Sequence, residues 1–174
     1  MKTKLLLVIF CGLISLQVSA QRKKKANNET SEFRYEASST VGQAAQGFTL
    51  LKVFTYSKSK NVPLIQSGKN AVHAVLFKGT ADYNDGAIRI KGQRPLVSSV
   101  TAYDENEKFF TEFFRDGGMY QRYVQVVNNG IPDVGDVVKV GKEYKIGVKV
   151  LVNKEGLRKA MEEAGIIRAL GGVF

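Results

Sequence analysis

The segment "KEYKIGVKVLVN", residues 142–153, constrains the fold of this chain more than any other stretch of its sequence. One set of alternate positions is apolar and the other is mostly polar or small. The apolar set is Tyr144, Ile146, Val148, Val150 and Val152, and the other is Lys145, Gly147, Lys149, Leu151 and Asn153. A period of two over this length predicts a strand with one buried and one wet face, which is typical of antiparallel sheets.

Further strands are expected on both sides of this one in the sequence. Gly47–Lys58 is rich in aromatic and β-branched residues and apolar on both faces, which predicts a central strand. Phe33–Gly42 is expected to give a short edge strand and a loop, and Met119–Gly130 another strand. Asn84-Asp85-Gly86 predicts a turn between two short extended pieces, and 95–103 is expected to be extended.

Three segments have the apolar period of a helix. The first is expected to start at Asn61 as N-cap with Pro63 in its first turn, and to bury one face. That face consists of Ile65, Gly68, Val72 and Val75/Leu76. Gly68 predicts a close approach of this helix to the sheet.

The second helix is expected to begin at Asp104 and to end at Gly117-Gly118, and the third to lie between an Asn153 cap and Gly165. The stripe of the third helix is Leu157, Ala160/Met161 and Ala164. Amphipathic strands that alternate irregularly with about three helices predict an α+β fold, a two-layer sandwich with a mostly antiparallel sheet. We expect a single domain over residues 31–174 with an apolar C-terminal tail.

Residues 1–20 have the layout of a secretory signal peptide. Lys2 and Lys4 precede an apolar stretch from Leu5 to Leu16, and small residues follow up to Ala20. An uncleaved membrane anchor needs about 20 apolar residues, more than this run supplies. Cys11 follows Ile9 and Phe10 rather than small residues, which disfavours a lipoprotein, and cleavage after Ala20 leaves no cysteine for disulfides or metal sites.

A short basic arm carries much of the positive charge. The formal charge of +10 falls to +8 without Lys2 and Lys4, and half of that remainder comes from Arg22, Lys23, Lys24 and Lys25. Residues 21–30 are polar and predicted to be disordered. Each such cation contributes about 1 kcal/mol near an anionic membrane, so the arm is either a solubilising tail or a weak contact to polyanions. No specific nucleic-acid binding is expected, because the rest of the chain has no comparable basic segment.

The sequence contains no recognisable catalytic or metal-binding set. His73 is the only histidine and lies among apolar residues, which favours packing or surface placement over ligation. Asp82–Gly86 departs from the spacing of a calcium loop, and the adjacent pairs Asp104/Glu105 and Glu162/Glu163 do not face each other. We therefore expect neither catalytic residues nor a metal or cofactor, and an enzyme of unrecognised type remains the least favoured class.

Two apolar groups leave an alternative open between core and docking surface. The first is the stripe Phe109, Phe110, Phe113 and Phe114, for which core packing is favoured. The second is the tail, which either packs back or contacts a partner through Ile166, Ile167, Leu170, Val173 and Phe174.

The signal peptide, "TLLKVFTYSK", "NAVHAVLFKG" and "KEYKIGVKVLVNKEGLRKAMEEAGI" together resemble small exported proteins of Bacteroidota. More distantly, this part of the chain is similar to periplasmic strand–helix–strand modules of flagellar and curli-type assembly lipoproteins. The chain lacks their lipid-bearing cysteine, so their membrane anchoring does not carry over. The resemblance implies an accessory or scaffolding role in the envelope.

Three function classes follow from these observations. The first is a non-catalytic envelope module, periplasmic, outer-membrane-associated or extracellular, that binds protein partners or itself through an open sheet edge or the tail. The second is adhesion to polyanions or a membrane surface through the arm, and the third is an enzyme. No transmembrane span is expected once the signal peptide is cleaved.

Overall fold

The computed structural model of the chain describes residues 33–58 and 64–169. The compact unit discussed below begins at Tyr35. The expected signal peptide and basic arm, and the predicted cap at Asn61 with Pro63, lie outside the described residues.

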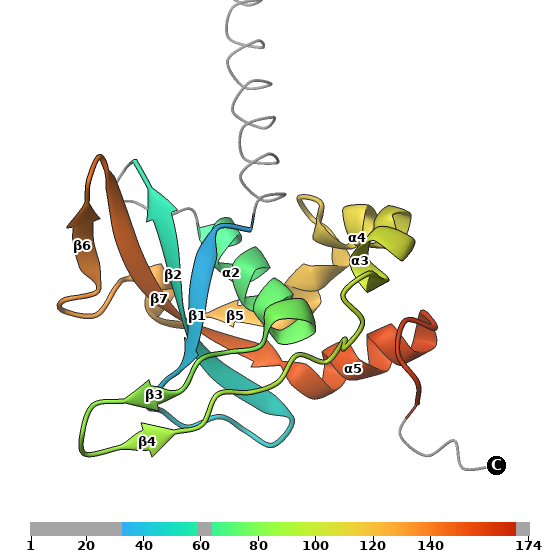
Figure 1. The fold of residues 1–174 in the computed structure, drawn as a ribbon, viewed down its shortest axis with the longest axis horizontal. Helices are drawn as coiled ribbons and strands as arrows, with labels where there is room; N and C mark the ends of the chain where they lie inside the picture. The colour runs from blue at the N-terminus through green and yellow to red at the C-terminus, as the bar shows by residue number, and fades with distance from the viewer. Residues whose placement is uncertain (1–32, 59–63, 170–174) are drawn as a thin grey trace, which may run out of the picture. The chain divides into compact units, whose positions relative to one another are not determined.

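An antiparallel sheet of five strands forms one layer of the fold (Figure 1). Its path runs β1 (Tyr35–Ser39), β2 (Phe48–Ser57), β7 (Glu143–Asn153) and β5 (Val124–Val126), and β6 (Val137–Val140) also pairs with β7. β5 and β6 share one edge of β7, since β5 pairs with its C-terminal half and β6 with its N-terminal half. The predicted α+β sandwich with a mostly antiparallel sheet is confirmed, with β2 central and β1 at an edge.

One face of the sheet forms the core, as the alternation in the sequence requires. On β7 the side chains of Ile146, Val148, Val150 and Val152 are buried, and on β2 the buried positions alternate in the same way. The opposite positions of β2 are half-buried or exposed, because no helix covers that face within the described residues. β2 is therefore a central strand, as predicted, because it pairs with β1 and β7. Its second face is more exposed to solvent than the apolar residues on both faces suggested.

Helix α2 (Leu64–His73) lies across the core face and continues as a π-helical turn, η1 (Ala74–Lys78). A Cβ added to Gly68 would lie 3.4 Å from the side chain of Val124, which confirms the expected close approach to the sheet. Val72, Val75 and Leu76 are buried, but Ile65 is 53% exposed, so its assignment to the buried face was wrong. The wider π-turn points the carbonyls of Val75 and Leu76 toward the segment 96–97, whose backbone N–H groups donate to them.

The predicted second helix is divided into α3 (Ala102–Glu105) and α4 (Glu107–Phe114). The break falls at Asn106, whose φ is −118° and whose side chain donates to the carbonyl of Ala102 over 2.9 Å. This competition of an asparagine side chain with the helical backbone explains why four α-helices are found among the described residues rather than three. The expected cap at Asp104 is wrong, because this residue lies inside α3.

The expected strand over Met119–Gly130 is mostly 3₁₀-helical. η2 (Met119–Tyr123) and η3 (Val127–Gly130) flank β5, which keeps only three strand residues. Asn128 and Asn129 both have φ of 51°. Asparagine tolerates this left-handed conformation, so the chain leaves the sheet at this point.

Helix α5 (Lys154–Glu163) follows β7 directly. The side chain of Asn153 accepts a hydrogen bond from the Gly156 N–H over 2.8 Å, which confirms the predicted N-cap. Leu157, Ala160 and Met161 are buried against the sheet layer. Gly165 closes the helix with a φ of 72°, whereas Ala164 is exposed and does not belong to the buried stripe.

The turn at residues 84–86 connects a small hairpin, β3 (Tyr83–Asn84) and β4 (Arg89–Ile90). The Asp85 carboxylate accepts hydrogen bonds from the N–H groups of Ala87 and Ile88, and Gly86 has a φ of 89°. The carboxylate is thus used within the turn, and the predicted turn is confirmed.

Candidate functional site

The C-terminal residues predicted to contact a partner are only partly described. Ile166 and Ile167 follow α5, are half-buried, and donate their backbone N–H groups to the carbonyl of Met161. This closes the helix end in the manner of a Schellman motif. Leu170, Val173 and Phe174 lie outside the described residues, as do Arg22, Lys23, Lys24 and Lys25.

His73 lies in an aromatic cluster rather than in a polar site. Its ring centroid is 5.1 Å from that of Phe77, and its Nδ1 lies 2.7 Å from the Tyr35 hydroxyl. Burial, and secondarily the charge of Lys78, lower the pKa of His73 to about 3. The predicted packing role is confirmed, since the neutral ring fills space among aromatic side chains. Within the described part of the chain, no group of three or more His, Cys, Asp or Glu residues is arranged to hold a metal ion.

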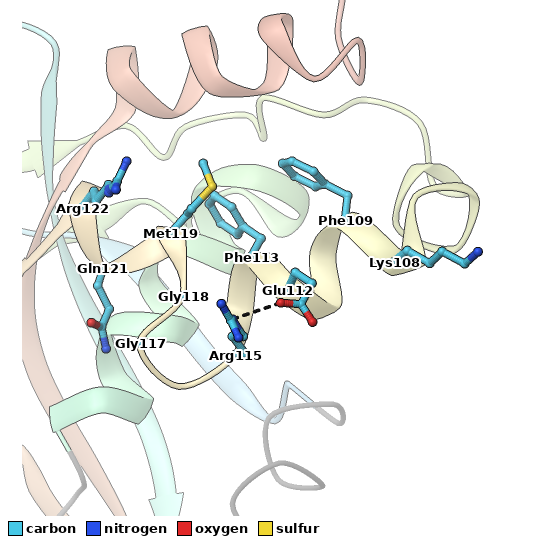
Figure 2. A pocket seen from close by; sticks show the side chains of 10 residues that line it. All are labelled: Lys108, Phe109, Glu112, Phe113, Arg115, Gly117, Gly118, Met119, Gln121 and Arg122. Atoms are coloured by element: carbon cyan, nitrogen blue, oxygen red, sulfur yellow. Dashed lines mark ion pairs between the residues drawn. The ribbon is translucent and has the colours of Figure 1, made fainter.

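A groove of about 740 Å³ lies along α4 and η2 (Figure 2). Its apolar side is formed by Phe109, Phe113 and Met119. The remaining lining side chains are polar or charged, or are glycines: Lys108, Glu112, Arg115, Gly117, Gly118, Gln121 and Arg122. Glu112 pairs with Arg115 at 3.0 Å, so Lys108 and Arg122 leave the rim with a positive balance.

The groove combines an apolar wall with a charged rim. Its only carboxylate is paired with Arg115, and the ten lining residues, all described, include no serine, threonine, histidine or cysteine. Of its apolar side chains, Met119 is exposed and Phe109 half-buried, whereas Phe113 belongs to the core. The docking interpretation of the phenylalanine stripe therefore retains only Phe109, and core packing is confirmed for the other three.

Gly118 fixes the loop that shapes this groove. A Cβ added there would lie 2.4 Å from the Phe113 carbonyl oxygen and 2.8 Å from those of Glu112 and Arg115. We therefore expect Gly118→Ala to lower the free energy of unfolding by about 1–3 kcal/mol, because three backbone carbonyls must move. Urea denaturation measures this difference.

Gly117→Asn is the matched control for that experiment. The Gly117 φ of 76° is one that asparagine tolerates, and a Cβ added there meets no atom within 4 Å. A Gly118→Ala variant as stable as this control would contradict the close packing of the loop.

A second hollow, of about 600 Å³, lies along α5. Lys154 donates to Gln93 over 2.8 Å, and Gln93 donates to the buried Thr49 hydroxyl over the same distance. Burial, and to a lesser extent the charge of Arg158, lower the pKa of Lys154. This chain of hydrogen bonds fastens α5 to β2 and to the segment after β4.

Strand β6 forms a different kind of surface. Val137, Val138 and Val140 are 41%, 51% and 47% exposed, and Lys139 is also exposed. Ile131 and Val134, in the loop before β6, are exposed as well. Five large aliphatic side chains are thus exposed on β6 and in the loop before it. β6 itself lies at the margin of the sheet, beyond β7 (Figure 1).

Asp133 and Asp136 hold the loop before β6 against the wet face of the sheet. Lys52 lies 2.6 Å from Asp136 and 3.4 Å from Asp133, and Lys149 lies 2.8 Å from Asp133. Burial alone would lower the pKa of Lys52, but hydrogen bonds and attraction from both aspartates raise it. The loop and β6 are therefore positioned by charge pairs on two central strands.

The register shows which backbone groups of β6 face outward. Gly147 N–H donates to the Asp136 carbonyl over 2.8 Å, so this pair is a hydrogen-bonded one. Hydrogen-bonded and non-bonded pairs alternate in an antiparallel ladder. Val138 and Val140 therefore direct their N–H and C=O groups to β7, and Val137 and Lys139 direct theirs away from it. Among the described residues, no strand other than β7 pairs with β6.

The opposite margin of the sheet, at β1, is covered. Ala81 donates to the Ala37 carbonyl and accepts from the Ser39 N–H, at 2.9 and 3.0 Å. Lys78 Nζ donates to the Tyr35 carbonyl over 2.9 Å. The chain thus protects one edge of its sheet with hydrogen bonds, whereas at the other no described strand pairs with the outward backbone groups of Val137 and Lys139.

No helix in the part of the chain that the structure describes is both long and apolar enough to span a membrane. In comparisons with known proteins, no family model, curated protein or solved structure matches the chain.

Proposed function

We propose that this protein is a non-catalytic, exported module of the cell envelope that acts as an accessory or scaffold by binding other proteins. The observation that carries this proposal is the contrast between the two margins of its sheet. β1 is closed by Ala81 and Lys78, whereas β6, which carries exposed valines, pairs with no strand but β7 among the described residues.

An edge of this kind binds an extended segment by strand addition. Backbone hydrogen bonds supply affinity, and alternate side chains supply selectivity. Val137 and Lys139 together offer two N–H donors and two C=O acceptors to such a segment. Long exposed apolar edges also promote aggregation, and β6 limits this hazard because it is only four residues long and contains Lys139.

Val137→Pro is expected to abolish binding at the β6 edge while leaving the fold intact. Proline removes the outward N–H of residue 137 and adds bulk at the edge, but the Val137 N–H does not bond to β7. Val137→Thr, which keeps the N–H and the β-branch, is the matched control and should still bind. The same proline at Val138 should destabilise the fold more, by about 1 kcal/mol for the lost ladder hydrogen bond.

The test is affinity capture from an envelope extract with protein starting at Gln21, at low and high salt. The proposal expects a defined protein partner that survives high salt, is retained by Val137→Thr and is lost with Val137→Pro. If the Val137→Pro variant still captures the partner, and capture is lost when residues 166–174 are removed, the contact is made by the C-terminal tail and not by β6.

Capture that fails at high salt and needs Arg22–Lys25 would instead favour adhesion to polyanions. No capture under any condition would count against a binding module.

A further inference from the structure

We propose that the β6 edge selects an extended segment with a carboxylate side chain opposite Lys139 and aliphatic side chains opposite Val137 and Val138. This inference rests on the proposed function, since it names the chemistry of the segment that the edge takes. It arises from the position of Lys139, the one charged residue of an otherwise aliphatic strand.

In the part of the chain that the structure describes, the Lys139 side chain has no acidic partner. Lys52, Lys145 and Lys149, on the adjoining strands, each pair with a carboxylate. No ion pair to Lys139 is found within residues 33–58 and 64–169, and its cross-strand neighbour on β7 is Tyr144. An incoming strand with an acidic residue opposite Lys139 would supply the opposite charge that stabilises a cross-strand pair.

The strand geometry fixes where the other side chains lie. Val137 and Lys139 share one face of the sheet, and Val138 and Val140 the other. An antiparallel segment of the form apolar–acidic–apolar–apolar would therefore place its carboxylate beside Lys139 and aliphatic side chains beside the three valines. Its residues opposite Val137 and Lys139 would exchange the backbone hydrogen bonds.

A second copy of β6 is the less suitable occupant. Antiparallel pairing centred on Val138 makes the two Lys139 side chains diagonal neighbours, and pairing centred on Lys139 sets them directly opposite each other. Like charges so placed are destabilising. Centring on Val137 sets Lys139 against Gly135, whose φ of 89° lies outside extended backbone. Lysine in an edge strand is a common device against self-pairing.

The experiment titrates ¹⁵N-labelled mature protein with two synthetic peptides, acetyl-TVEVVT-amide and acetyl-TVKVVT-amide, and follows backbone amide shifts. We expect shifts at Val137 and Lys139, and about tenfold tighter binding of the glutamate peptide at low salt, because attraction replaces repulsion. In Lys139→Glu protein the preference should reverse. An unchanged preference in that variant, equal binding of both peptides, or no binding would overturn the inference.

Failure of this inference can be told from failure of the proposed function. Suppose that capture is lost with Val137→Pro but that the two peptides bind equally or not at all. Binding by strand addition would then be retained as the proposed function, and the specificity for an acidic segment would be rejected.

Sedimentation equilibrium tests the second-copy alternative. Wild-type protein is not expected to self-associate through β6. The Lys139→Val variant is expected to associate at lower concentration than Lys142→Val, which serves as a control in the adjacent turn. Wild-type dimers that Val137→Pro dissociates would overturn the proposal in favour of a second copy.

Discussion

Phe110→Ala is expected to lower the free energy of unfolding by about 3–5 kcal/mol. The Phe110 side chain is fully buried and lies at the centre of the aromatic cluster. Its ring centroid is 4.9 Å from that of Phe77 and 5.1 Å from those of Tyr103 and Phe109. Removal of this ring forfeits its burial and leaves a cavity between α4 and η1 that rigid neighbouring rings cannot fill. Urea denaturation followed by circular dichroism measures the change.

Phe109→Ala is the matched control, because this adjacent phenylalanine is half-buried at the groove. We expect Phe109→Ala to lower the free energy of unfolding by roughly a third as much as Phe110→Ala, since much less apolar area returns to water. Equal effects at the two positions would mean that the stripe does not divide into core and groove wall as the structure shows.

The strands and helices with strong periodicity could be predicted from sequence because burial acts on side chains at fixed spacing. β2, β7 and α5 are of this kind, and the Asn153 cap adds a local signal. The predictions of strands and helices fail where the backbone conformation of particular residues overrides the hydrophobic period. Two successive asparagines with positive φ end β5 early, and the side chain of Asn106 divides the phenylalanine helix.

β6 was missed for a different reason. All four of its residues are exposed, so the segment lacks the alternation of buried and wet positions that marks a strand. The sequence does mark the ends of this strand, since an aspartate, three valines and a lysine lie between Gly135 and Gly141. Both glycines have positive φ and bound the strand.

The proposed binding edge could be anticipated only in general terms. An open sheet edge follows from any antiparallel sheet that does not close, but which edge stays open depends on contacts distant in sequence. Ala81 and Lys78 cover β1 from a segment about 40 residues away in the chain, as the bond from Lys78 to Tyr35 illustrates. Likewise, the outward direction of the Val137 and Lys139 backbone groups follows from register, which the residue types alone do not determine.

Acid is expected to destabilise this protein well before its carboxylates protonate, through His73. Burial lowers the pKa of the folded-state histidine to about 3 from its ordinary value of 6.5. Between these two values the unfolded chain binds a proton that the folded chain does not, so the free energy of unfolding falls as pH falls. The slope approaches about 1.4 kcal/mol for each pH unit. From pH 6.5 to about 4.5 we expect the free energy of unfolding to fall by about 2 kcal/mol. This is less than the limiting slope would give over the same interval, because the ring is half-buried.

The window above pH 4.5 isolates this histidine from the acidic groups. Glu36 and Asp133, whose pKa values are lowered by hydrogen bonds from Lys145 and Lys149, reduce stability only when pH falls below their unfolded pKa values, about 4. His73→Gln keeps a hydrogen-bond acceptor for Tyr35 but has no titrating ring. Its stability should therefore be lower at pH 7 but nearly constant down to pH 4.5. Equal slopes for the variant and the wild type would show that the buried imidazole is not the group through which acid weakens the fold.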